Sequence, residues 1–196
     1  MIKQAIRLYG RTILAGVLGI VMYVSVGVLV SVAVPRGEPL SATATFLMNL
    51  IALVLQGSIY FLIIYAGMWS LGDKEANAVQ FGHMQATAAR GFHIGCVAAI
   101  PSVLTFLVLV ADKVFSFWPL SAAIYRLCHM ALYPILAWSM GSVVSVTTAD
   151  LAWWQLLCAG IPVLFLPFAA GISYYFGFKH ILVSDRLMFV SKKKKQ

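Results

Sequence analysis

Polar and ionisable side chains gather in one short stretch, residues 69–95, of an otherwise apolar chain. Four of them are of types that ligate divalent metals: Asp73, Glu75, His83 and His93. No spacing such as H-E-x-x-H places two imidazoles on one helical face, so the sequence predicts no metal site and no cofactor. We expect instead a connector that orients membrane segments or docks a partner protein, and the candidate docking residues are Asp73, Lys74, Glu75, Asn77, His83 and Arg90.

Nucleophiles and proton-transfer groups are scarce in the rest of the chain. The three cysteines lie in apolar segments and none belongs to a C-x-x-C pair, which is typical of small buried side chains. Cys128 and His129 are adjacent, but neighbouring helical residues point about 100° apart and make a poor catalytic pair. An enzyme that acts on lipid would have only Asp112, His129 and Asp150 as candidate acids or bases. We therefore predict no catalytic residue.

The composition excludes a water-soluble globular domain. The chain has 196 residues, of which 62% are hydrophobic and 10% charged, and its mean hydropathy is +0.93. Soluble domains carry about 25% charged residues and about 45–50% apolar ones. We expect a single integral membrane domain that extends over residues 1–196.

Four uncharged apolar runs are long enough to cross a bilayer, which takes about 20 helical residues: 13–34, 46–69, 92–111 and 151–176. They lack the alternation of barrel strands, so the predicted fold class is an all-α transmembrane bundle. Pro101 is expected to bend the third run and Pro167 to kink the last. Asn49 and Gln56 lie seven residues apart on one helical face, which predicts hydrogen bonds between helices.

A fifth uncharged stretch, residues 127–146, is diluted by serines, glycine and proline. With four crossings and an inside N-terminus, eleven Lys and Arg residues lie inside and three outside, whereas five crossings give five against nine. Because basic residues accumulate on the cytoplasmic side, four crossings with both termini cytoplasmic are favoured. Residues 127–146 are then a re-entrant or interfacial helix on the outer face, and five crossings are the alternative.

The connection between the second and third runs, residues 70–91, is predicted to be cytoplasmic. Gly72 would end the second crossing, and a short surface helix would run from Asp73 to about Ala89. Small residues on the first run predict close packing against another helix, and these helix-packing candidates are Ala15, Gly16, Gly19, Gly27 and Ser31.

Both ends of the chain are basic. Residues 1–12 are predicted to form an amphipathic helix, because Lys3, Arg7 and Arg11 recur at every fourth position. Such a stripe is attracted to anionic lipid head groups, but ordinary positive-inside anchoring of the first crossing is the favoured explanation. The tail, residues 177–196, is predicted to be cytoplasmic and carries the lipid-surface candidates Lys192, Lys193, Lys194 and Lys195. Neither end has the interleaved aromatics of a nucleic-acid site, so no nucleic-acid partner is predicted.

A set of aromatic and glycine motifs suggests a relationship. Trp69 with Gly72-Asp73, then Asn77, Val79, Phe81-Gly82 and Gly91, precede Tyr175-x-Gly177-Phe178-Lys179 and a basic tail. This combination resembles a group of small multi-spanning membrane proteins of Gram-positive gut bacteria. The resemblance covers about a third of the chain. It implies a bacterial cytoplasmic membrane and carries no activity with it.

Three classes of function remain open on these grounds. A non-enzymatic subunit or accessory component of a membrane complex is favoured by the small-residue stripe and the polar connector. The alternative is the substrate-binding component of a transporter, similar in size and hydrophobicity to the vitamin-capturing subunits of energy-coupling-factor transporters, which have six crossings. The third class is a membrane enzyme acting on lipid.

Overall fold

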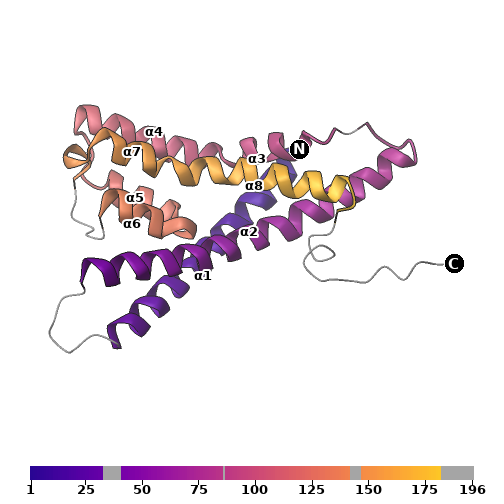
Figure 1. The fold of residues 1–196 in the computed structure, drawn as a ribbon. Helices are drawn as coiled ribbons and strands as arrows, with labels where there is room; N and C mark the ends of the chain where they lie inside the picture. The colour runs from indigo at the N-terminus through magenta and orange to yellow at the C-terminus, as the bar shows by residue number, and fades with distance from the viewer. Residues whose placement is uncertain (33–40, 86, 142–146, 182–196) are drawn as a thin grey trace.

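The computed structural model describes residues 1–32, 41–85, 87–141 and 147–181, and these ranges are helical without a β-strand (Figure 1). Most of the helices lie roughly along one long axis. In chain order they are α1 (Ile2–Val32), α2 (Ala42–Gln80), α3 (Arg90–Ala98), α4 (Ile100–Phe115), α5 (Ser121–Cys128), the 3₁₀ turn η1 (Met130–Leu132), α6 (Tyr133–Met140), η2 (Thr148–Asp150), α7 (Trp153–Ala159) and α8 (Ile161–Phe178).

Three helical segments are long and apolar enough to cross a membrane: α1, α2 and the α7–α8 segment Trp153–Phe178. The pair α3 and α4 makes a fourth if it counts as one span, although it is bent by 48°. The bend falls where expected, because Pro101 occupies the first turn of α4 and has no backbone N–H to continue the ladder of α3. The all-α membrane fold is therefore confirmed at this level.

Antiparallel pairing of α1 and α2 defines two ends of the bundle. Gln4 contacts Glu75, Gly19 contacts Gln56 and Tyr23 contacts Asn49, so residue numbers rise along one helix as they fall along the other. We call the end with Gln4 and Glu75 the Glu75 end. The opposite end, where α1 and α4 finish and α2 and α7 begin, is the Asp112 end (Figure 1).

Helices α5 and α6 form a hairpin, residues 121–140, that opens toward the Asp112 end. Ser121 at the start of α5 contacts Thr148, and Trp138 near the end of α6 stacks on Phe46 at the start of α2. The tip of the hairpin, η1, lies against the middle of α1. The expected helix over residues 127–146 is not continuous, because α5 ends at Cys128 and the 3₁₀ turn η1 separates it from α6. Residues 142–146, the last part of the expected helix, lie outside the described ranges.

Glycines let α2, α3 and α8 approach each other closely at the Glu75 end. A Cβ atom added to Gly72 would collide with the backbone of Tyr174, and one added to Gly177 would collide with the backbone of Trp69. On α3, a Cβ on Gly95 would lie 2.7 Å from the Cα of Pro167. Three of the glycines in this junction, Gly72, Gly91 and Gly177, belong to the motif set found in the sequence.

The predicted end of the second crossing at Gly72 is wrong. Helix α2 continues without a break through Gly72 to Gln80, so there is no separate helix from Asp73 to Ala89. Gly72 is buried inside α2 and serves as a contact point for α8. Residues 1–12 are likewise not a separate surface helix, because α1 is continuous from Ile2 to Val32 and buries Ala5 and Leu8 in the core.

One buried carboxylate ties four helices together at this end. Glu75 of α2 is 6% exposed, and its carboxylate accepts a 2.5 Å hydrogen bond from the Tyr174 hydroxyl of α8. The guanidinium of Arg90 on α3 lies 3.4 Å away, and the side-chain amide of Gln4 on α1 donates at 3.3 Å. Breaking a buried charged network is costly because its remaining members lose their partners.

We predict that Gly177→Ala lowers the stability of the purified protein by about 2 kcal/mol, because the new methyl group must separate α8 from the α2 backbone. Gly57→Ala on α2 is the matched control, since a Cβ there meets nothing within 4 Å. The control should leave stability unchanged or raise it by up to about 1 kcal/mol through helix propensity. Thermal unfolding in mild detergent measures both, and equal midpoints would contradict the tight α2–α8 junction.

Candidate functional site

The hairpin is fixed to the bundle by a buried carboxylate at its open end. Asp112 of α4 is 3% exposed and accepts hydrogen bonds from the Trp118 backbone N–H at 2.7 Å and the Ser121 hydroxyl at 2.5 Å. The Ser121 hydroxyl also lies 2.7 Å from that of Thr148. A carboxylate near the first turn of α5 interacts favourably with the unpaired N–H groups there. Asp112 therefore joins α4, the start of the hairpin and η2.

The tip of the hairpin rests on small residues of α1. A Cβ on Gly19 would lie 3.1 Å from the carbonyl oxygen of Met130, and one on Gly16 would lie 3.7 Å from the backbone of Ala131. The Gly19 carbonyl also accepts a 2.8 Å hydrogen bond from the buried Gln56 side chain of α2. The sequence prediction that Gln56 joins two helices is thus confirmed, and the same contact supports the α1 backbone beneath the hairpin.

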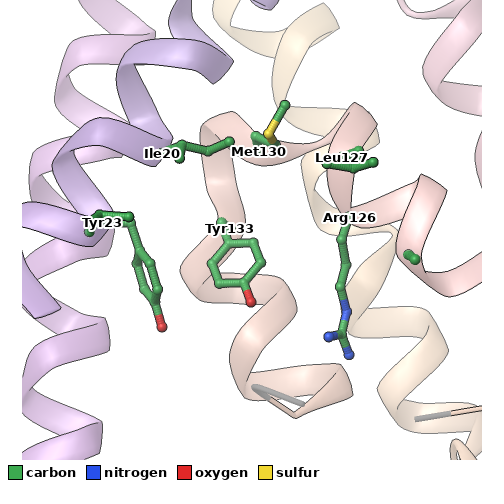
Figure 2. Close-up of a pocket in the computed structure, with 8 residues that line it drawn as sticks. Ile20, Tyr23, Arg126, Leu127, Met130 and Tyr133 are labelled. Atoms are coloured by element: carbon green, nitrogen blue, oxygen red, sulfur yellow. The ribbon is translucent and has the colours of Figure 1, made fainter. Parts of the chain in front are cut away.

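A pocket of about 350 Å³ lies between α1 and the hairpin (Figure 2). We call it the lateral pocket, because exposed apolar residues form part of its wall: Val24 is 56% exposed and Leu127 60%. Its lining is almost entirely apolar, and the residues used below are Ile20, Tyr23, Arg126, Leu127, Met130 and Tyr133.

The polar groups of the lateral pocket all lie at one end of it. Figure 2 shows the side chains of Tyr23, Tyr133 and Arg126 extending in the same direction, away from Ile20 and Met130. That direction is toward the Asp112 end, because Tyr23 follows Ile20 along α1 and Arg126 reaches the last residue of α6. The lateral pocket therefore has an apolar deep part beside the hairpin tip and a polar part nearer the Asp112 end.

Arg126 is the one cation among the described residues that line the pocket. It is 5% exposed, and its Nη2 donates a 2.9 Å hydrogen bond to the carbonyl of Met140. Beside it, the rings of Tyr23 and Tyr133 meet edge to face with centroids 4.7 Å apart, and the Tyr23 hydroxyl donates to the Asn49 side chain at 3.1 Å. The Tyr133 hydroxyl makes no hydrogen bond to any described residue, so it is available to an occupant.

These properties match the two parts of an anionic amphiphile. A guanidinium presents paired donors that fit the oxygens of a phosphate or carboxylate, and it binds them most strongly in a low-dielectric setting. A buried basic residue in a membrane protein commonly marks a functional site. The apolar lining of the deep part matches the polarity of a hydrocarbon chain. The arrangement of charged and apolar groups in the lateral pocket therefore suits the binding of an anionic amphiphile.

The docking candidates fall into two groups. Glu75 and Arg90 belong to the buried network at the Glu75 end, where they hold the chain's own helices. Asp73 accepts a 2.8 Å hydrogen bond from His180 at the surface, while Lys74, Asn77 and His83 are exposed. Any docking surface here is limited to the exposed group.

The packing and lipid candidates are also divided. Ala15, Gly16 and Gly19 are buried as expected, and Gly27 approaches the Met48 sulfur of α2, at 3.9 Å from an added Cβ. Ser31 is exposed and its hydroxyl donates to the Val28 carbonyl of its own helix, so packing within the chain does not bury it and a contact with a partner helix stays a prediction.

Lys3, Arg7 and Arg11 are exposed at the start of α1, but Arg11 turns toward α2, where a Cβ on Gly67 would collide with its guanidinium. The lysines at 192 to 195 lie outside the described ranges.

The three candidate acids and bases do not form one catalytic group. Asp112 is occupied at the start of α5, and His129 lies at the other end of that helix with its Nδ1 3.0 Å from the Tyr125 carbonyl. Asp150 is exposed and accepts a hydrogen bond from the Thr147 hydroxyl in the same turn. Among the residues that the structure describes, no three His, Cys, Asp or Glu side chains are placed to hold a metal ion.

Arg126 is the site residue that the sequence analysis missed. In the sequence it is simply one of the basic residues of a connection, because it directly precedes the uncharged stretch 127–146. The available signal was its position in residues 121–128, where it lies next to Tyr125 within a short amphipathic helix.

Comparisons with protein-family models, with curated proteins and with solved structures find no match.

We predict that Asp112→Ala lowers the stability of the protein by about 2 kcal/mol, because Ser121 and the Trp118 N–H lose a buried charged acceptor. Asp150→Ala, which removes an exposed carboxylate from the neighbouring turn, should change stability by less than about 0.5 kcal/mol. Thermal unfolding of both variants in the same detergent measures the difference. A smaller loss for Asp112→Ala than for Asp150→Ala would refute the structural role of Asp112.

Proposed function

We propose that this protein is a non-enzymatic integral membrane protein that holds an anionic amphiphile in the lateral pocket. The observation that carries the proposal is the alignment of Arg126, Tyr23 and Tyr133 at one end of an otherwise apolar pocket beside exposed helix faces. Such a site corresponds to the ligand-binding rather than the catalytic class, because its described lining has two tyrosine hydroxyls and a guanidinium but no carboxylate or imidazole to act as a general base.

The proposed orientation in the membrane agrees with the polarity of the pocket. Helices α1, α2, α3–α4 and α7–α8 would make four crossings of a bacterial cytoplasmic membrane, with both chain termini cytoplasmic. The hairpin would be re-entrant from the outer face. Arg126 would then lie toward the outer head groups and Met130 toward the bilayer centre, which matches a lipid-like occupant with its head outward.

The orientation is tested by labelling introduced cysteines in intact cells with a membrane-impermeant maleimide, in a variant whose native cysteines are replaced by alanine. Phe115→Cys lies at the Asp112 end, where Phe115 is 75% exposed, and should react in intact cells. His83→Cys lies beyond the Glu75 end and should react only after permeabilisation. The reverse pattern would contradict the proposed orientation.

Binding is tested with two probes of equal chain length, dodecyl phosphate and dodecanol, added to the full chain in mild detergent. Dodecyl phosphate should raise the unfolding midpoint by mass action and dodecanol should not. Arg126→Gln should weaken the phosphate effect about ten-fold in apparent affinity, the value of one charge-assisted hydrogen bond. Lys179→Gln, an exposed charge at the other end, is the control.

Tyr133→Phe provides a second variant in case Arg126→Gln fails to fold. It removes a hydroxyl that has no partner among the described residues, so the unfolding midpoint without probe should be unchanged while the probe effect decreases. Equal stabilisation by both probes, or no difference between these variants and Lys179→Gln, would reject the proposal.

A second candidate function, a subunit of a membrane complex, is favoured by the exposed end of α2. Phe81 is 71% exposed beside Lys74, Asn77 and His83, so this surface offers an aromatic side chain together with polar ones. Replacing Lys74, Asn77 and Phe81 by alanine should abolish co-purification of a stoichiometric partner and leave the membrane yield unchanged. Retained co-purification would remove this candidate.

A further inference from the structure

A second pocket, of about 240 Å³, lies between α1 and α2 near the Glu75 end. We call it the basic cleft. The residues that matter to its chemistry are Gln4, Arg7, Arg11, Gly67, Ser70 and Lys74. It is separate from the lateral pocket, with which it shares no lining residue.

The three cations of the basic cleft are not neutralised by the part of the chain that the structure describes. The acidic side chains nearest in sequence are engaged elsewhere: Asp73 pairs with His180, and Glu75 with Tyr174 and Arg90. Among the residues that the structure describes, no carboxylate lines the basic cleft. Cations that repel one another across a narrow cleft favour an anion between them.

The position of Arg11 is built into the packing of α1 on α2. Its guanidinium occupies the space that a side chain at residue 67 would fill, so Gly67 is the reason that Arg11 can lie over α2. The packing of α1 on α2 therefore places the Arg11 guanidinium over Gly67, inside the basic cleft.

Gln4 adds a second requirement on the occupant. Its side-chain nitrogen donates to Glu75, while its Oε1 is buried and has no hydrogen-bond partner among the described residues. An unpartnered buried acceptor carries a free-energy cost that a hydroxyl donor on the occupant would relieve. The three cations, the Ser70 hydroxyl and the Gln4 side chain that line the cleft fit a phosphate diester whose head group carries hydroxyls.

We propose that the basic cleft binds the head group of a phosphatidylglycerol-type lipid. A lipid is favoured over a soluble phosphate because the same part of α1 exposes large apolar side chains: Ile6 is 67% exposed and Ile13 55%. Acyl chains lie against such a surface while the phosphate enters the cleft. The proposal goes beyond the lateral pocket and does not depend on it.

The test is to equilibrate the full chain in detergent with equal amounts of phosphatidylglycerol and phosphatidylcholine and to measure retained lipid by native mass spectrometry. The wild-type chain should retain phosphatidylglycerol preferentially. Arg11→Gln should reduce that preference about ten-fold, as expected for one charge-assisted hydrogen bond. Arg126 remains intact in every variant, so the lateral pocket contributes equally to all.

Gly67→Ala separates a built site from summed surface charge. The added methyl displaces the flexible end of Arg11 without removing its charge, so it should also lower the preference several-fold. Gly57→Ala on the same helix and Lys179→Gln are the controls and should retain the wild-type preference. A Gly67→Ala variant that behaves like wild type, or an equal loss in Lys179→Gln, would overturn the proposal in favour of non-specific charge.

Competition with inorganic phosphate distinguishes a site for a lipid head group from a site for a soluble phosphate. At 10 mM, about the concentration of a common buffer, it should leave the retained phosphatidylglycerol unchanged, because it cannot contact the apolar face of α1. Displacement of the lipid by inorganic phosphate would overturn the lipid assignment. These outcomes are independent of the dodecyl phosphate experiment, which reports on Arg126.

Discussion

The buried carboxylate of Glu75 is the interaction on which the Glu75 end of the bundle depends. It receives the Tyr174 hydroxyl from α8, lies beside the Arg90 guanidinium of α3 and accepts from Gln4 of α1. These partners reach it only because Gly72, Gly91 and Gly177 allow the helix backbones to approach. In a membrane, where apolar surface gives little net drive for helix association, close packing and buried polar contacts carry that role.

The sequence predicted the membrane helices well and their local ends poorly. Uncharged runs of about 20 residues identify spans because the bilayer tolerates few charges, and α1, α2 and the last segment were found this way. Gly72 and Asp73 read locally as a helix end, but packing against α8 overrides that signal and keeps α2 helical to Gln80. Likewise, the break at Cys128 could not be seen in residues 127–146, since it is set by the contact of the hairpin tip with Gly16 and Gly19.

The candidate sites were less predictable than the fold. In the sequence, Arg126 looks like an ordinary basic residue of a connection. It becomes a candidate binding residue only because α5 turns back into the bundle and buries it. Arg11 was expected at a lipid surface, yet its place over Gly67 depends on a contact between residues 56 positions apart in the chain. The spacing of residues within one helix shows that basic side chains share a face. It does not show which neighbouring helix has a glycine that leaves room for one of them.

The length of α2 has a mechanical consequence. Its 39 residues extend about 58 Å at 1.5 Å per residue, roughly twice the thickness of a hydrocarbon core. The same uninterrupted rod contacts α1 through Gln56 beneath the hairpin and carries Lys74 and Asn77 near its far end. Because α2 is one unbroken helix, a small change in its tilt at the level of the hairpin would move its far end, near Gln80, by several ångströms.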